Sequence, residues 1–212
     1  MKITSLSKMG KITSLSVQKN NKNRVNVFVD EEFYIGLSLE SVYKYSLKVG
    51  QEIDIERIEA IISESEKADA INKATVYISK TIKTKRQVKD YIVKKGYSEE
   101  LAYQVVDKLK EYGYIDDKEY SKRYLESTNK TQGIRLAEFK LMSKGVKKED
   151  IETAMNNSEI EYEKSAKALA EKHLRNKEIT KENLMKTYRY LIGRGFTYEQ
   201  ADYALKEFKE NL

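Results

Sequence analysis

Positively charged side chains are the most numerous groups in this sequence that could do chemistry. Lys and Arg neutralise phosphate groups through distributed charge, without a fixed geometry toward a base. Such cations are densest between residues 73 and 95, where eight basic residues stand against one acid, Asp90. The sequence therefore predicts contact with a polyanion such as nucleic acid through Lys83, Lys85, Arg86, Lys89, Lys94, Lys95, Arg123, Lys130, Arg135, Lys140, Lys144 and Arg194.

Each of these cations also has an ordinary explanation, which is a solvated face of a helix. Any one of them fits that explanation better than a contact. Only the set, placed along one edge of a repeated structure, indicates a binding surface.

The sequence lacks the residue patterns of catalytic and metal sites. Its one histidine, His173, lies among basic residues and has no cysteine companion, because the chain has no Cys. No Walker A loop, dinucleotide-binding glycine motif or nucleophile elbow occurs. Asp116 and Asp117 stand where a helix should begin, so capping of that helix is their expected role. We expect no enzyme, no metal and no cofactor.

Tyrosine is abundant, with 16 residues in the chain. Stacking on unpaired bases is one use for such rings. Packing in the core and at its rim is the expected role of most of them, because they recur at helical spacing. These are Tyr77, Tyr91, Tyr97, Tyr112, Tyr120 and Tyr124.

Composition indicates a water-soluble chain whose charge is unevenly distributed. The 212 residues carry a net charge of +6. Residues 1–66 hold 9 basic and 10 acidic groups, whereas residues 67–212 hold 31 and 24. The mean hydropathy is −0.71, and no apolar run approaches the ~18 residues that a membrane span needs. Together with the absence of cysteine, this predicts a cytoplasmic protein without membrane contact.

The elements that must position these cations are marked by a recurring glycine. A basic residue, a glycine and an apolar residue recur at 95–97, 144–146 and 194–196, so the glycines are 49 and 50 positions apart. Apolar residues flank each glycine at matched offsets, which indicates matched helix faces. Glycine suits the left-handed residue that ends a helix. A new helix can start at once, capped by Ser98 in the first unit and by Thr197 with Gln200 in the third.

The chain is therefore expected to be mainly α-helical, with three tandem three-helix repeats that form an elongated, curved body. A small antiparallel β module should precede them, with strands at 12–18, 25–29 and 33–37. A short helix at 39–45 and another near 56–66 should follow. The expected parts are a disordered leader at 1–10, the β module and connecting helix at 11–66, and repeats at 67–115, 116–158 and 159–212. The leader is assigned because residues 2–7 duplicate residues 11–16 (KITSLS).

Several of these segments resemble the RecX family. Residues 94–100 (KKGYSEE) and 109–117 (LKEYGYIDD) carry its most specific motifs. Gly133 with Arg135, then Leu141 and residues 144–146, resemble its second repeat, and residues 194–197 (RGFT) its third. The opening pairs at 12–13 and 18–19, with residues 24–27, are similar to the N-terminal extension of Gram-positive members.

The resemblance implies a non-enzymatic regulator of the RecA recombinase. Such proteins lie in the groove of the RecA filament on single-stranded DNA and dampen its growth, ATP hydrolysis, strand exchange and coprotease activity. We expect a monomer. Ala137 and Lys140 depart from the larger aliphatic residue and the acid found in many relatives. A general nucleic-acid-binding protein and a protein-interaction scaffold stay open as alternatives.

Overall fold

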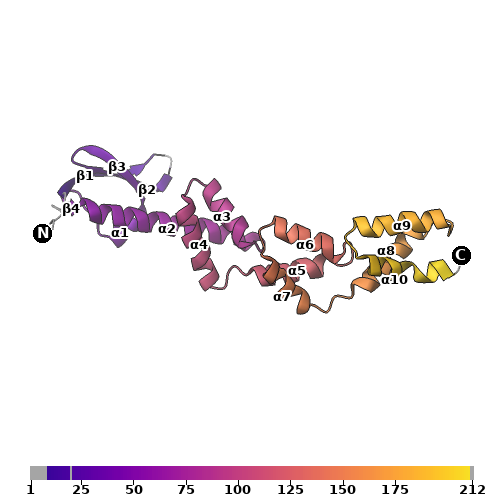
Figure 1. Ribbon diagram of the computed structural model, residues 1–212. Coiled ribbons are helices and arrows are strands. Elements are labelled where there is room, and N and C mark those ends of the chain that lie inside the picture. The colour runs from indigo at the N-terminus through magenta and orange to yellow at the C-terminus, as the bar shows by residue number, and fades with distance from the viewer. Residues whose placement is uncertain (1–8, 20, 211–212) are drawn as a thin grey trace. The chain divides into compact units, whose positions relative to one another are not determined.

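The chain folds into two compact units whose boundary falls inside one long helix. The computed structural model describes residues 9–19 and 21–210. The N-terminal unit is Met1–Lys73 and the C-terminal unit is Ala74–Leu212 (Figure 1). The expected class, mainly helical with a small antiparallel sheet at the N-terminus, is confirmed.

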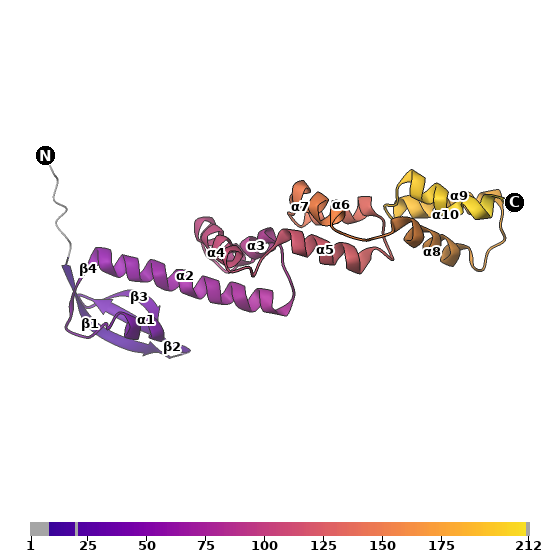
Figure 2. The ribbon, with the colours of Figure 1, turned by 90° about the horizontal axis from the view of Figure 1, so that it is seen from below.

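The N-terminal unit is a four-stranded antiparallel sheet packed with helices (Figure 2). Its strands, in the spatial order β3-β2-β1-β4, are β1 (Met9–Gln18), β2 (Asn21–Val29), β3 (Glu32–Ser38) and β4 (Glu52–Asp54). Its helices are α1 (Leu39–Lys44) and the first part of α2 (Ile55–Lys80).

Alternation of side chains along β2 forms the core of this unit. Val25, Val27 and Val29 are buried on one face, as the period of two in a strand requires. They pack with Ile12 of β1 and Ile58 of α2 in one apolar cluster. The N-terminal unit therefore has a small apolar core of its own.

Three features of this unit differ from what the sequence predicts. The strand β4 was not expected, and it forms because Glu52 and Ile53 pair with Lys11 and Gly10. The helix α2 runs unbroken from Ile55 to Lys80, whereas the sequence predicts a helix near 56–66 that ends before the first repeat begins at residue 67. No glycine or proline occurs between residues 51 and 95 to interrupt it. The expected leader lies mostly outside the described residues, but its last two residues, Met9 and Gly10, begin β1.

The C-terminal unit holds three units of three helices each, called here repeats 1 to 3. Repeat 1 comprises the end of α2, α3 (Lys85–Lys94) and α4 (Glu99–Glu111). Repeat 2 comprises α5 (Asp117–Thr128), α6 (Ile134–Ser143) and α7 (Lys148–Asn156). Repeat 3 comprises α8 (Tyr162–Leu174), α9 (Lys181–Gly193) and α10 (Tyr198–Glu210). Repeats 2 and 3 each have an apolar core of their own.

A glycine in the left-handed conformation separates the second and third helices of every repeat. The φ angles are +94° at Gly96, +83° at Gly145 and +88° at Gly195. The amide after each glycine donates to a carbonyl in the last turn of the preceding helix, as in Tyr97 to Ile92. The next helix then begins as predicted: Ser98 caps α4, and Thr197 and Gln200 exchange two hydrogen bonds.

These glycine corners also join one repeat to the next, which the sequence did not reveal. The carbonyl of Lys144 in the corner of repeat 2 accepts a hydrogen bond of 2.8 Å from the hydroxyl of Thr84, the N-cap of α3. A Cβ on Gly145 would lie within 3.0 Å of the Arg86 side chain. The corner of repeat 2 therefore packs on the first turn of α3 in repeat 1. This contact, made by Thr84 and Arg86 with Lys144 and Gly145, is called here the first joint.

The second joint repeats this arrangement with main-chain groups on both sides. The carbonyls of Arg194 and Gly195 accept hydrogen bonds of 2.9 and 3.0 Å from the amides of Gly133 and Arg135, at the start of α6. A Cβ on Gly195 would lie within 3.0 Å of backbone atoms of Leu136. The first turn of α6 therefore receives the corner of repeat 3 at close range.

The side chain of Asp117 crosses the first joint. Asp116 caps its own helix, as predicted, through the amides of Lys118 and Glu119. Asp117 instead accepts from the amide of Lys85 in the preceding repeat at 3.0 Å, and it is 3% exposed. Burial raises the pKa of the Asp117 carboxyl, while the Lys85 amide and ammonium act against that rise. The sequence prediction of local capping was thus wrong for Asp117.

Replacing corner glycines with alanine should separate two costs in stability, that of backbone strain and that of disturbing the contact between repeats. A left-handed alanine costs about 1–2 kcal/mol at any of the three. Among the described residues nothing lies within 4 Å of a Cβ on Gly96, so Gly96→Ala should cost only that amount. Gly195→Ala should cost at least about 2 kcal/mol more, because the methyl collides with backbone. Urea unfolding of the two variants measures the difference, and equal losses would contradict the joint.

The buried carboxylate at the first joint gives a second prediction. Asp117→Asn keeps an oxygen for the Lys85 amide and should change stability by less than about 0.5 kcal/mol at pH 7, whereas Asp117→Ala should cost about 1–2 kcal/mol. Because folding raises the pKa of Asp117, its contribution is greatest in acid and is lost as pH rises through the folded value. When the free energy of unfolding is measured from pH 7 down to pH 4, the wild type should therefore become more stable relative to Asp117→Asn.

Candidate nucleic-acid interface

Four of the twelve predicted cations are engaged in ion pairs. Their nitrogen–oxygen distances are 3.9 Å for Lys85–Asp117, 3.8 Å for Arg86–Asp90, 3.6 Å for Lys89–Glu99 and 2.6 Å for Arg123–Glu119. Exposed pairs of this kind contribute about 0–1 kcal/mol. A phosphate could therefore compete for the exposed Arg86 and Arg123. Lys85 differs, because its partner is buried in the joint.

Five of the cations lie over tyrosine rings. The distances from the charged group to the ring centroid are 5.1 Å for Lys83–Tyr77, 5.0 Å for Lys89–Tyr103, 5.3 Å for Lys95–Tyr91, 5.2 Å for Arg135–Tyr198 and 5.1 Å for Arg194–Tyr190. Attraction to a ring face favours this placement of each cation, by only about 0.5–1 kcal/mol at an exposed site. Sequence reasoning treated the tyrosines and the cations separately, whereas the structure combines them.

The side chain of Lys89 is only 22% exposed. Burial opposes its charge, but the Tyr103 hydroxyl and the Glu99 carboxylate prevail and raise the pKa of Lys89. Its charge is committed to the contact between α3 and α4. Lys89 is therefore a weaker candidate for a ligand contact than its neighbours.

The remaining cations are the most available. Within residues 9–19 and 21–210, the ammonium groups of Lys94, Lys130 and Lys144 have no ion pair, hydrogen bond or ring contact. Lys140 donates to the amide oxygen of Gln132 at 2.8 Å and stays exposed. These four lysines can approach a phosphate without losing an ionic partner.

The three glycine corners present different chemistry at equivalent positions. The residue before the glycine is Lys95, Lys144 or Arg194, and the residue four earlier is Tyr91, Lys140 or Tyr190. In repeats 1 and 3 the cation therefore covers a ring on the same helix face. In repeat 2 two lysines occupy these places.

A second ring backs each of the two corner tyrosines. Tyr77 of α2 stacks on Tyr91 with centroids 4.1 Å apart and planes at 4°. In repeat 3 the ring of His173 stacks on Tyr190 at 4.5 Å and 6°. Burial, with help from the charge of Lys177, lowers the pKa of His173, and its Nδ1 is 2.9 Å from the Thr187 hydroxyl. His173 is thus a neutral packing ring near pH 7.

Some of the twelve predicted contact residues also take part in the joints between repeats, which spacing alone could not show. The backbone and carboxylate contacts of Lys85 and the alkyl chain of Arg86 belong to the first joint. Arg135 spans the second joint, because its guanidinium lies over Tyr198 of repeat 3. The only signal available in the sequence was their position at the first turn of the second helix in each repeat.

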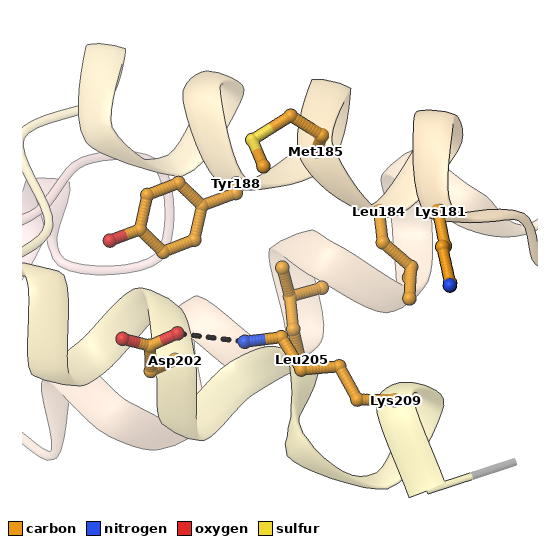
Figure 3. A pocket seen from close by; sticks show the side chains of 7 residues that line it. All are labelled: Lys181, Leu184, Met185, Tyr188, Asp202, Leu205 and Lys209. Atoms are coloured by element: carbon orange, nitrogen blue, oxygen red, sulfur yellow. Dashed lines mark hydrogen bonds and ion pairs between the residues drawn. The ribbon is translucent and has the colours of Figure 1, made fainter. Parts of the chain in front are cut away.

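An apolar hollow of about 630 Å³ lies in repeat 3, between α9 and α10 (Figure 3). Asp202 and Lys209 form an ion pair of 2.8 Å at its edge. Its lining residues are Lys181, Leu184, Met185, Tyr188, Asp202, Leu205 and Lys209. It includes none of the twelve predicted cations, so it is separate from the candidate interface.

No cluster of acidic or histidine side chains in residues 9–19 and 21–210 is arranged to hold a metal ion. Across those same residues, no helix has both the length and the apolar character of a membrane span.

Known proteins share this architecture over nearly the whole chain. A solved structure of a regulatory protein RecX covers 95% of this chain and 99% of its own, with a TM-score of 0.69 and 24% identity. A RecX structure from Lactobacillus salivarius covers 68% of this chain and 97% of its own, with a TM-score of 0.62 and 21% identity. At this identity the two structures establish the fold.

Sequence comparison establishes the family. Residues 10–54 match the regulatory protein RecX N-terminal domain, and residues 161–205 match the RecX third three-helix domain. Regulatory protein RecX of Clostridium botulinum (strain Alaska E43) is 36% identical over 94% of this chain and 96% of its own. That of Clostridium perfringens (strain SM101) is 34% identical over 96% and 98%. The chain therefore belongs to the RecX family of regulatory proteins.

Proposed function

We propose that this protein binds RecA filaments on single-stranded DNA and inhibits their recombinase, ATPase and coprotease activities. It acts by binding rather than by catalysis, as a cytoplasmic monomer without a cofactor. Membership of the RecX family supports a regulatory role, because the relatives are named regulatory proteins. The net positive charge of the chain supports a partner that contains nucleic acid.

The observation that carries this proposal is the placement of cations at the glycine corners. Hydrogen bonds accepted by the corner carbonyls fix repeats 2 and 3 on the preceding repeat. Because the residue before each glycine is basic, Lys95, Lys144 and Arg194 stand at equivalent points of successive repeats. A series of fixed cations suits a ligand that is itself periodic, such as a nucleoprotein filament.

RecA-dependent ATP hydrolysis on single-stranded DNA tests the proposal. Wild-type protein at or below the concentration of RecA should inhibit the reaction. The variant Lys140→Gln with Lys144→Gln should inhibit less and should bind single-stranded DNA more weakly. The slope of log K against log salt should become less negative by about 1.4, since each lost phosphate contact contributes about 0.7 to its magnitude.

A matched control removes two lysines that are paired on their own helices. Lys148 and Lys186 lie 3.6 and 2.7 Å from Glu152 and Glu182, one helical turn away. Glutamine at both makes the same change in net charge and should leave inhibition intact. Wild-type protein without effect on RecA would refute the proposal. DNA binding without that effect would support a general nucleic-acid-binding protein, and loss of neither activity in the double variant would support a scaffold.

A further inference from the structure

Two of the three glycine corners carry the same three-layer arrangement. In repeat 1 the layers are Tyr77, Tyr91 and the ammonium of Lys95. In repeat 3 they are His173, Tyr190 and the guanidinium of Arg194. A ring from the first helix of the repeat supports a tyrosine from the second, and the corner cation lies over that tyrosine. The arrangement thus recurs although its members differ in kind.

The cation is the one layer of each stack that can leave easily. Tyr91 and Tyr190 are half-buried, and the supporting ring fixes the plane of each. Lys95 and Arg194 are exposed, and each cation reaches its ring from one helical turn away. The attraction of a cation to a ring is weak at an exposed site. A flat, uncharged group could therefore replace the cation without disturbing the rings beneath.

We propose that these two corners are stacking platforms for the unpaired bases of a single-stranded nucleic acid. A base takes the place of Lys95 on Tyr91, or of Arg194 on Tyr190, and continues a stack of parallel rings. The displaced cation then contacts the phosphate next to that base. This rests on the polyanion contact of the proposed function and adds that the strand is recognised through its bases.

Single strands are the class of nucleic acid that this chemistry fits. Every base has a π face, so stacking on tyrosine tolerates any sequence, while bases in a duplex are already stacked on each other. Repeat 2 has Lys140 and Lys144 where the other corners have a tyrosine and its cation. Its corner is therefore a phosphate contact without a platform.

Another tyrosine beneath a lysine provides the control. Tyr112 lies under Lys108 at 4.8 Å. Its neighbour Tyr114 meets it edge-on, with planes at 64°, and no parallel ring among residues 9–19 and 21–210 supports it. Tyr112 is 56% exposed and outside the three corners. If any exposed tyrosine beside a lysine sufficed for stacking, Tyr112 would contribute as the corner tyrosines do.

Binding of the full chain to two labelled strands, without RecA, tests this inference. One strand is a thymidine 20-mer and the other an abasic strand with the same number of phosphates. Fluorescence anisotropy should show tighter binding to the thymidine strand by about fivefold or more for each platform engaged. Tyr91→Leu and Tyr190→Leu should each remove part of this preference and leave abasic binding unchanged, whereas Tyr112→Leu should not alter it.

Phenylalanine variants show whether a loss of preference in the leucine variants comes from the loss of the ring or from misfolding. Tyr91→Phe and Tyr190→Phe keep the ring and should keep the preference for thymidine. Equal affinity for the two strands would overturn the inference, as would leucine variants that retain the full preference. Because RecA is absent from this assay, inhibition of RecA without base preference would leave the proposed function standing alone. Base preference without inhibition of RecA would support the stacking platforms and refute the proposed function.

Discussion

The fit of a glycine corner onto the first turn of a helix in the preceding repeat governs the C-terminal unit. A helix start has unpaired amides and a helix end has unpaired carbonyls. At the second joint each group satisfies the other, through Gly133, Arg135, Arg194 and Gly195. At the first joint the side chains of Thr84 and Asp117 share this role. The ends of short helices, which are usually weak points, thus become the contacts between repeats.

Much of this fold could be predicted from the spacing of glycines and apolar residues. Helix ends at Gly96, Gly145 and Gly195 follow from local backbone chemistry, which a sequence displays directly. The joints could not be foreseen, because they connect residues 60 positions apart, as for Thr84 and Lys144. The short strand β4 was missed for a related reason, because it depends on pairing with β1 rather than on a local signal. The continuity of α2 was missed although the lack of glycine and proline between residues 51 and 95 is a local signal for it.

The candidate interface was harder to foresee than the fold. The sequence identifies Lys and Arg but not what each side chain touches. Lys85 serves a joint, Lys89 an enclosed helix contact and Arg123 an ion pair, while Lys94 and Lys130 are available. The distinction for Lys85 and Lys89 arises from neighbours on other helices, whereas the partner of Arg123 lies one turn away on its own helix. The pairing of Tyr with Lys or Arg four residues later was visible in the sequence and is the signal that could have linked stacking to charge.

The second joint is made by main-chain atoms, and this gives the chain freedom to diverge. A hydrogen bond between an amide and a carbonyl is indifferent to the side chains attached to either residue. Close approach restricts Gly133 and Gly195, and the side chains of Arg135 and Tyr198 also meet across this joint, but the hydrogen bonds between repeats 2 and 3 join main-chain groups alone. Related structures with 24% and 21% identity retain this architecture. A scaffold of this kind can acquire a new binding surface one residue at a time while its internal spacing stays the same.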